Sequence, residues 1–116
     1  MIETWHEAAP ESAFPEDGKL ALQIAGWSVL IMRTDEGYRA LNDRCTHQAA
    51  RLSPGRLRRG AIMCPLHGAR FEAATGRCIG GAYPDLRRFE LRVENGMISV
   101  LIPDIAPGPS ERPAAS

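Results

Sequence analysis

The 116-residue sequence has no long apolar run, which excludes a conventional transmembrane helix. Its longest run, from Trp27 to Met32, is interrupted by Ser28 and falls far short of the ~18 residues that span a bilayer. Residues 1–5 contain neither the basic nor the apolar region of a secretory leader. We therefore expect a soluble, cytoplasmic protein that does not associate with membranes.

Aromatic residues, net charge and cysteines are also scarce. Aromatics make up 6% of the chain and all hydrophobic residues 44%, so mostly aliphatic side chains must build the core of one small domain. Basic and acidic residues number 14 each, so the net charge points to no partner. The three cysteines (Cys45, Cys64 and Cys78) are an odd number in a chain with no visible leader. This favours a metal or redox role over a disulfide framework.

Helical periodicity is also weak, and the patterns that are present predict an all-β protein. Residues 27–41 predict one hairpin with its turn at Asp35-Glu36-Gly37. Residues 89–102 predict a second hairpin, in which apolar and charged residues alternate and one face should be buried. Its turn, Asn95-Gly96, is the strongest short hairpin signal that a sequence offers.

The predicted hairpins lie on either side of a segment of different character. Residues 42–86 are rich in glycine and proline and predict a loop-rich subdomain on the β scaffold, which is where functional sites are usually found. We expect residues 1–102 to form a single domain. Residues 103–116 contain four prolines with alanine, glycine and serine, and predict a flexible C-terminal tail.

Two short boxes in the loop-rich segment each combine a cysteine and a histidine: Cys45-Thr46-His47 and Cys64-Pro65-Leu66-His67, with sixteen residues between His47 and Cys64. Three interpretations are open. The four residues could be ordinary core residues, although their order within such loops argues against coincidence. They could bind one zinc ion, although zinc fingers usually keep the two cysteines together and the two histidines together. The pairs could also cross, with both cysteines on one metal and both histidines on another.

The boxes and the residues after them resemble a Rieske iron–sulfur domain. The resemblance also includes Gly68, Arg70-Phe71 and Thr75-Gly76, and it covers about residues 5–102. It implies the Rieske fold, with small antiparallel sheets and a loop-rich cluster-binding subdomain. Residues 80–84 resemble the proline-containing loop that covers the cluster in this family, with Ala82 in place of a proline.

The resemblance implies one [2Fe–2S] cluster, because Rieske centres have two histidines in place of two cysteines on one iron. Cys45 and Cys64 would bind the inner iron, and His47 and His67 the outer iron near solvent. Cys78 matches no ligand position and is expected to be a buried thiol. The chain would be a one-electron carrier and no enzyme, passing electrons from an NAD(P)H-dependent flavoprotein reductase to a terminal Rieske non-haem iron oxygenase.

Four positions distinguish the low-potential from the high-potential members of the family. High-potential Rieske proteins have a disulfide at the positions of Ala50 and Leu66, and hydroxyl side chains at those of Ala69 and Phe71. Hydrogen bonds from such hydroxyls to the cluster sulfurs favour the reduced state. Without them, the expected potential is about −150 mV rather than +300 mV.

The charges are unevenly distributed along the chain. Ten arginines and only three acidic residues lie between Arg44 and Arg92, a local charge of +7, whereas the other residues carry four basic and eleven acidic side chains, or −7. This pattern favours transient docking of an acidic partner near His47 and His67. Nucleic acid is not expected, because the arginines are not interleaved with stacking aromatics.

Two other functions remain open. A small subunit of an assimilatory nitrite reductase has a similar fold, but that family often lacks some of the four ligands. A zinc-stabilised interaction module is the second alternative. We expect the electron carrier itself to be a monomer.

Overall fold

The computed structural model describes residues 2–66 and 68–113. These residues form short and medium strands joined by turns and loops, with a single turn of 3-10 helix. The all-β fold class predicted from the sequence is therefore confirmed. In chain order the elements are β1 (Glu3–Pro10), η1 (Glu11–Ala13), β2 (Lys19–Ile24), β3 (Trp27–Thr34), β4 (Gly37–Asn42), β5 (Arg56–Arg58), β6 (Ala61–Met63), β7 (Arg70–Glu72), β8 (Arg88–Phe89), β9 (Leu91–Glu94) and β10 (Met97–Pro103).

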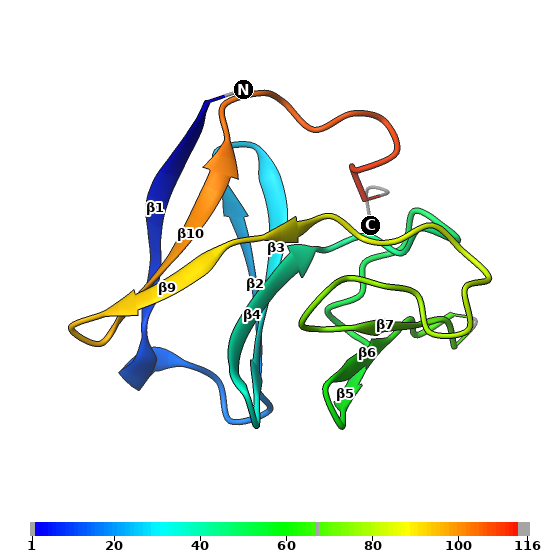
Figure 1. The fold of residues 1–116 in the computed structure, drawn as a ribbon, viewed down its shortest axis with the longest axis horizontal. Helices are drawn as coiled ribbons and strands as arrows, with labels where there is room; N and C mark the ends of the chain where they lie inside the picture. Colours follow the sequence, from blue (N-terminus) through cyan, green and yellow to red (C-terminus); the bar gives the residue numbers. More distant parts are fainter. Residues whose placement is uncertain (1, 67, 114–116) are drawn as a thin grey trace.

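The strands form three antiparallel sheets. One has the order β1-β10-β9, the second β2-β3-β4-β8, and the third β5-β6-β7. Figure 1 shows the first two sheets packed together as a base, with the small β5-β6-β7 sheet and its long loops set to one side. Chain segments 43–55 and 64–87 lead from the base into this smaller part and back.

Strand β3 is the centre of the molecule because both of its faces are buried, as its dense apolar run predicts. Trp27, Val29 and Ile31 enter the core of the base. Leu30 and Met32 point the other way, into the core beneath the loops of the smaller part. Successive residues of a strand point to opposite faces, so one strand serves two cores.

Two-residue turns with positive φ join several of the hairpins. Asn95 (φ 51°) and Gly96 (φ 78°) form the predicted turn between β9 and β10. The same conformation joins β5 to β6 at Arg59 (φ 51°) and Gly60 (φ 75°). Type I′ turns of this kind fit the right-handed twist of paired strands. The second turn was not predicted, because arginine rarely adopts a left-handed conformation.

The prediction for β9 was wrong in one respect. The hairpin is present, but the predicted buried face is lost along the strand: Phe89 is 3% exposed, Leu91 is half-buried and Val93 is 38% exposed. Strand β9 is an edge strand that pairs only with β10 in its sheet, so its outer end extends beyond the core.

Residues 104–113 follow β10 and run back toward the loops of the smaller part (Figure 1). Trp27 Nε1 donates to the Ile105 carbonyl at 2.9 Å, and Asn42 Nδ2 donates to the Glu111 carbonyl at 3.0 Å. The sequence did not indicate these contacts, and the flexibility expected of this segment stays a prediction. No helix in the described part of the chain is long and apolar enough to cross a membrane.

Candidate metal centre

Two loops carry the predicted ligands, and the same hydrogen bond closes each of them. The Cys45 N–H donates to the Ala50 carbonyl at 2.9 Å, and the Cys64 N–H donates to the Ala69 carbonyl at 2.7 Å. In both cases the bond runs from the cysteine to the fifth residue after it. Each loop therefore begins at a cysteine whose backbone is anchored.

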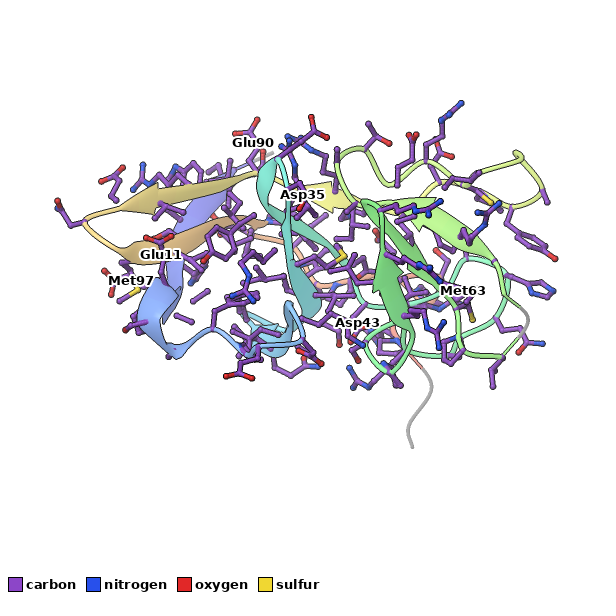
Figure 2. The ribbon with its side chains drawn as sticks, turned by 90° about the horizontal axis from the view of Figure 1, so that it is seen from below. Glu11, Asp35, Asp43, Met63, Glu90 and Met97 are labelled. Carbon is purple, nitrogen blue, oxygen red and sulfur yellow. The ribbon has the colours of Figure 1, made fainter. Side chains whose placement is uncertain are left out.

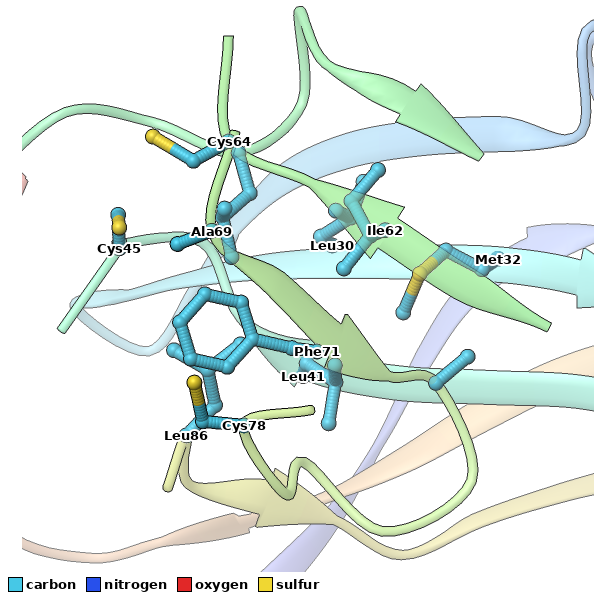
Figure 3. Packing of buried hydrophobic residues seen from close by; sticks show 12 residues of the cluster. Leu30, Met32, Leu41, Cys45, Ile62, Cys64, Ala69, Phe71, Cys78 and Leu86 are labelled. Atoms are coloured by element: carbon cyan, nitrogen blue, oxygen red, sulfur yellow. The ribbon is translucent and has the colours of Figure 1, made fainter. Parts of the chain in front are cut away.

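The two cysteines lie together in the core beneath the loops. Cys45 is 0% and Cys64 is 1% exposed, and Figure 3 shows both side chains at the same end of this core, beside Ala69 and Phe71. Burial raises the pKa of the Cys45 thiol, the backbone N–H groups of Gln48 and His47 lower it, and the neighbouring Cys64 thiol raises it further. The Cys64 sulfur is thus close enough to Cys45 to disfavour ionisation of the Cys45 thiol.

His47 lies further out than the cysteines. Its side chain is half-buried, and its ring stacks on the Tyr83 ring with centroids 4.1 Å apart and an interplanar angle of 16°. Thr46 Oγ1 donates to the Pro84 carbonyl, which links the first loop to the segment that carries Tyr83. The segment 80–84, which the sequence suggested as a covering loop, therefore lies directly against the first box. His67 lies outside the described residues.

Asp43 anchors the backbone at the end of the first loop through hydrogen bonds, a role that the sequence did not reveal. Its carboxylate is completely buried and accepts hydrogen bonds from the Leu52 and Ser53 N–H groups, each at 2.8 Å. Arg51 Nη1 lies 3.6 Å from the second carboxylate oxygen. A buried charge with these partners fixes the backbone of residues 51–53 against the strand end that leads to Cys45. An aspartate two residues before a cysteine has no distinctive sequence signature.

Glycine allows the segment after β7 to pack closely against the loops. Gly76 has φ +81°, and a Cβ there would lie 2.4 Å from the Leu86 carbonyl oxygen. The Leu86 N–H donates to the Gly76 carbonyl at 2.8 Å. Phe71 and Cys78 form an isolated β-bridge in the same region, so this part of the core is held largely by backbone contacts.

The donor set fits an iron–sulfur group. Cys45 and Cys64 are adjacent buried thiols. Metal centres bind cysteine as the thiolate, so a strongly positive centre at this place would favour the ionised form that burial disfavours at Cys45. The backbone N–H groups directed at Cys45 are the kind of donors that stabilise negative charge on cluster sulfurs. The half-buried imidazole of His47 lies on the outer side of this pair.

A family model described as "Rieske [2Fe-2S] domain" matches residues 4–93. The chain belongs to this family. It is a Rieske ferredoxin with one Rieske-type [2Fe–2S] cluster, and it acts as an electron carrier rather than as a catalyst.

Similar proteins include ferredoxins and a related subunit. The ferredoxin component of the naphthalene 1,2-dioxygenase/salicylate 5-hydroxylase systems of Ralstonia sp. is 30% identical over 82% of this chain and 92% of the relative. A chain in the complex of reduced oxygenase and oxidized ferredoxin of carbazole 1,9a-dioxygenase is 28% identical (TM-score 0.76), with 83% of this chain and 91% of that chain covered. The putative NADH-dependent nitrite reductase small subunit of Mycobacterium tuberculosis shares the fold alone: it is 20% identical, its TM-score is 0.78, and 90% and 100% of the two chains are covered.

The positions that set this Rieske ferredoxin apart can now be placed. All three cysteines are free, and Leu66, at one of the two disulfide positions of high-potential members, is 57% exposed. Ala69 and Phe71 are buried beside the cysteines and bear no hydroxyl. Cys78 is buried at 2% exposure in the same core, as expected. Figure 3 shows it on the opposite side of the Phe71 ring from Cys45 and Cys64.

Proposed function

We propose that the cluster is bound by Cys45 and Cys64 on the inner iron and by His47 and His67 on the outer iron. The paired burial of Cys45 and Cys64 supports the first half of this assignment. The outward position of His47 supports the second half, and His67 is assigned from its place in the second box. When bound, the cluster supplies reversible one-electron chemistry.

We infer that the protein takes electrons from an NAD(P)H-dependent flavoprotein reductase and passes them to a terminal Rieske non-haem iron oxygenase in the cytoplasm. The observation that carries this inference is the complete pair of boxes in a chain that resembles dioxygenase ferredoxin components over most of its length. His47 is half-buried and stacked on Tyr83 in the first loop, and Leu66 in the second loop is exposed. A partner docked over these loops would come close to the outer iron. We expect a monomer that makes such contacts transiently.

We also infer a reduction potential near the low end of the Rieske range. Ala69 and Phe71 offer no O–H donor to the cluster sulfurs, so the added electron of the reduced state is less stabilised than in high-potential members. Redox titration followed by visible absorption measures this value. A midpoint well above zero would contradict the inference.

The nitrite reductase alternative rests on the fold alone, which ferredoxins share. The two boxes favour a cluster carrier over a subunit with an incomplete ligand set. A zinc-stabilised module is disfavoured by the comparison with Rieske ferredoxins.

Reconstitution tests the proposed pathway. The protein is combined with a flavoprotein reductase, NADH or NADPH, and a terminal oxygenase encoded near its gene. The expected result is reduction of the cluster by the reductase and reoxidation by the oxygenase, with substrate hydroxylation that requires the ferredoxin. A cluster that is reduced by the reductase but supports only nitrite reduction would favour the alternative.

A further inference from the structure

The outer face of the β5-β6-β7 sheet is strongly basic. Its inner face contributes Leu57, Ile62 and Phe71 to the core, so the intervening residues point away from the core. Strand pairing places Arg56, Met63 and Arg70 in one row across the three strands. The exposed arginines Arg56, Arg58, Arg59 and Arg70, with the half-buried Ala61 and Met63, line a hollow of about 350 Å³. We call it the arginine face.

The acidic residue that strand pairing places on this side of the sheet, Glu72 in the row of Arg58 and Ala61, forms its ion pair with Arg77 and not with an arginine of this face. Among the described residues, none of its four guanidinium groups has a carboxylate within ion-pair distance. The ends of the face differ, however. Arg58 and Arg59 also border a second hollow that contains Glu16, Asp17 and Asp35, so nearby acidic groups moderate their charge. Arg56 and Arg70 line the first hollow and do not border the second.

Arg56 and Arg70, which do not border the hollow that contains the acidic residues, lie at the end of the arginine face nearest the cluster loops. Met63, between Arg56 and Arg70 in the row, directly precedes Cys64 in the chain. Figure 2 shows Met63 at the end of the small sheet, next to the long loops. A carboxylate-bearing surface placed against Arg56 and Arg70 would therefore lie beside the second cluster loop.

We propose that the arginine face is a docking surface for an acidic redox-partner protein, with Arg56 and Arg70 as its main contacts and the half-buried Met63 between them as an apolar contact. The proposal rests on the proposed electron-carrier function. It extends the docking surface proposed around His47 to the outer face of the β5-β6-β7 sheet. Arginines suit carboxylate partners because a guanidinium group can donate two parallel hydrogen bonds to one carboxylate, a bidentate contact. Such charges chiefly accelerate the encounter and add little to the final affinity.

The test compares two double variants that remove the same charge from different places. Arg56→Gln/Arg70→Gln alters the arginine face, whereas Arg88→Gln/Arg92→Gln alters two exposed arginines of the base as a matched control. Electron transfer is measured by voltammetry at gold coated with a carboxylate-terminated monolayer, which stands in for the acidic partner, and with a hydroxyl-terminated monolayer. Transfer to the terminal oxygenase is measured in parallel by stopped flow.

At low ionic strength the Arg56/Arg70 variant should transfer electrons to the carboxylate surface and to the oxygenase about 10-fold more slowly than the natural protein. The control variant should change by less than about 2-fold, and the difference should disappear at high salt. The potential and spectrum of the cluster should not change.

Equal losses in the two variants would overturn the proposal, as would equal natural rates on carboxylate and hydroxyl surfaces. Tight binding of a DNA duplex that depends on Arg56 and Arg70 would also overturn it, in favour of a nucleic-acid site. The electrode requires only a redox-active cluster, so the docking proposal can fail there while the pathway stands. A missing cluster signal or an inactive oxygenase assay would instead count against the proposed function.

Discussion

The two hydrophobic cores on either side of β3 are built differently. In the core of the base, strands contribute large side chains, including Trp27 and Phe89, whose rings meet edge to face at 5.6 Å. The core beneath the loops contains all three cysteines, small residues such as Ala69 and Ala73, and Phe71 as its one aromatic residue among those fully buried. The first core can be stable through packing alone, whereas the second uses backbone hydrogen bonds and, when loaded, its cluster.

This difference shows how one small domain can separate folding from function. The base gains stability from buried apolar area, and the loops need only hold their residues in place on it. Asp43 and Gly76 serve the loops in this way, since each fixes backbone rather than filling space. The contrast predicts that changes in the base lower stability, whereas changes near the loops affect the cluster first.

The largest effect is expected for Cys45→Ala. Loss of one inner-iron thiolate should abolish the visible spectrum and iron content, while the far-ultraviolet circular dichroism of the base remains. Cys78→Ala is the matched control, since Cys78 is buried in the same core but is not a proposed ligand. It should retain the cluster. A full cluster in Cys45→Ala would refute the ligand assignment.

The next largest effect is expected for Ile98→Ala in the base. Ile98 is completely buried, so its truncation should lower the free energy of unfolding by about 2–5 kcal/mol. Ile105→Ala, at a residue that is 49% exposed, should cost less than about 0.5 kcal/mol. Chemical denaturation measures both, and the cluster spectrum of the folded protein should not change. A spectral change in Ile98→Ala would mean that the cores are not separable.

A comparison of two glycines separates strain from steric conflict. Both Gly76 (φ +81°) and Gly96 (φ +78°) are left-handed, which costs a non-glycine residue about 1–2 kcal/mol. Only at Gly76 would a Cβ also clash, against the Leu86 carbonyl oxygen, which should add about 1–3 kcal/mol. Gly76→Ala should therefore destabilise the protein more than Gly96→Ala and should also weaken cluster retention. Equal unfolding free energies would contradict the close packing seen here.

Phe71→Tyr should change the cluster more than the fold. Phe71 is completely buried beside the cysteines, and a tyrosine hydroxyl at this position could donate to a cluster sulfur. The reduction potential should become more positive, with destabilisation of about 1–3 kcal/mol from the extra atom. Redox titration and denaturation measure the two effects. An unchanged potential would remove the hydroxyl explanation for the low value.

The smallest effect is expected for Glu111→Gln. Arg87 lies over the Trp27 ring at 4.8 Å and forms an ion pair with Glu111, so this pair links the C-terminal segment to the base core. Loss of this ion pair should lower the free energy of unfolding by at most about 1 kcal/mol, and the effect should shrink at high salt. Glu94→Gln, which breaks the more exposed pair with Arg92, should cost still less. A larger effect of Glu94→Gln would argue against a structural role for the segment.

The sequence predicted those features that depend on side-chain pattern. The apolar run at Trp27–Met32 marked the doubly buried strand β3, Asn95-Gly96 marked the β9–β10 hairpin, and the two boxes marked the loops of the centre. The β5-β6-β7 sheet was not predicted strand by strand, because each of its strands has only three residues.

Other features could not be read from the sequence because they depend on three-dimensional position. Asp43 acts through its burial, and Tyr83 through stacking on a residue 36 positions earlier in the chain. The C-terminal segment is bound through the carbonyl groups of Ile105, Glu111 and Arg112, and backbone groups have no sequence signature. Its composition therefore predicted only flexibility.

Electron paramagnetic resonance of the reduced protein tests the central claim most directly. Histidine labelled with ¹⁵N allows the imidazole nitrogens to be detected through their coupling to the unpaired electron. We expect a [2Fe–2S] signal from a protein with ~2 irons and ~2 sulfides per chain, with nitrogen couplings that decrease when His47 or His67 is replaced. A colourless protein containing one zinc per chain, or a cluster signal without nitrogen coupling, would contradict it.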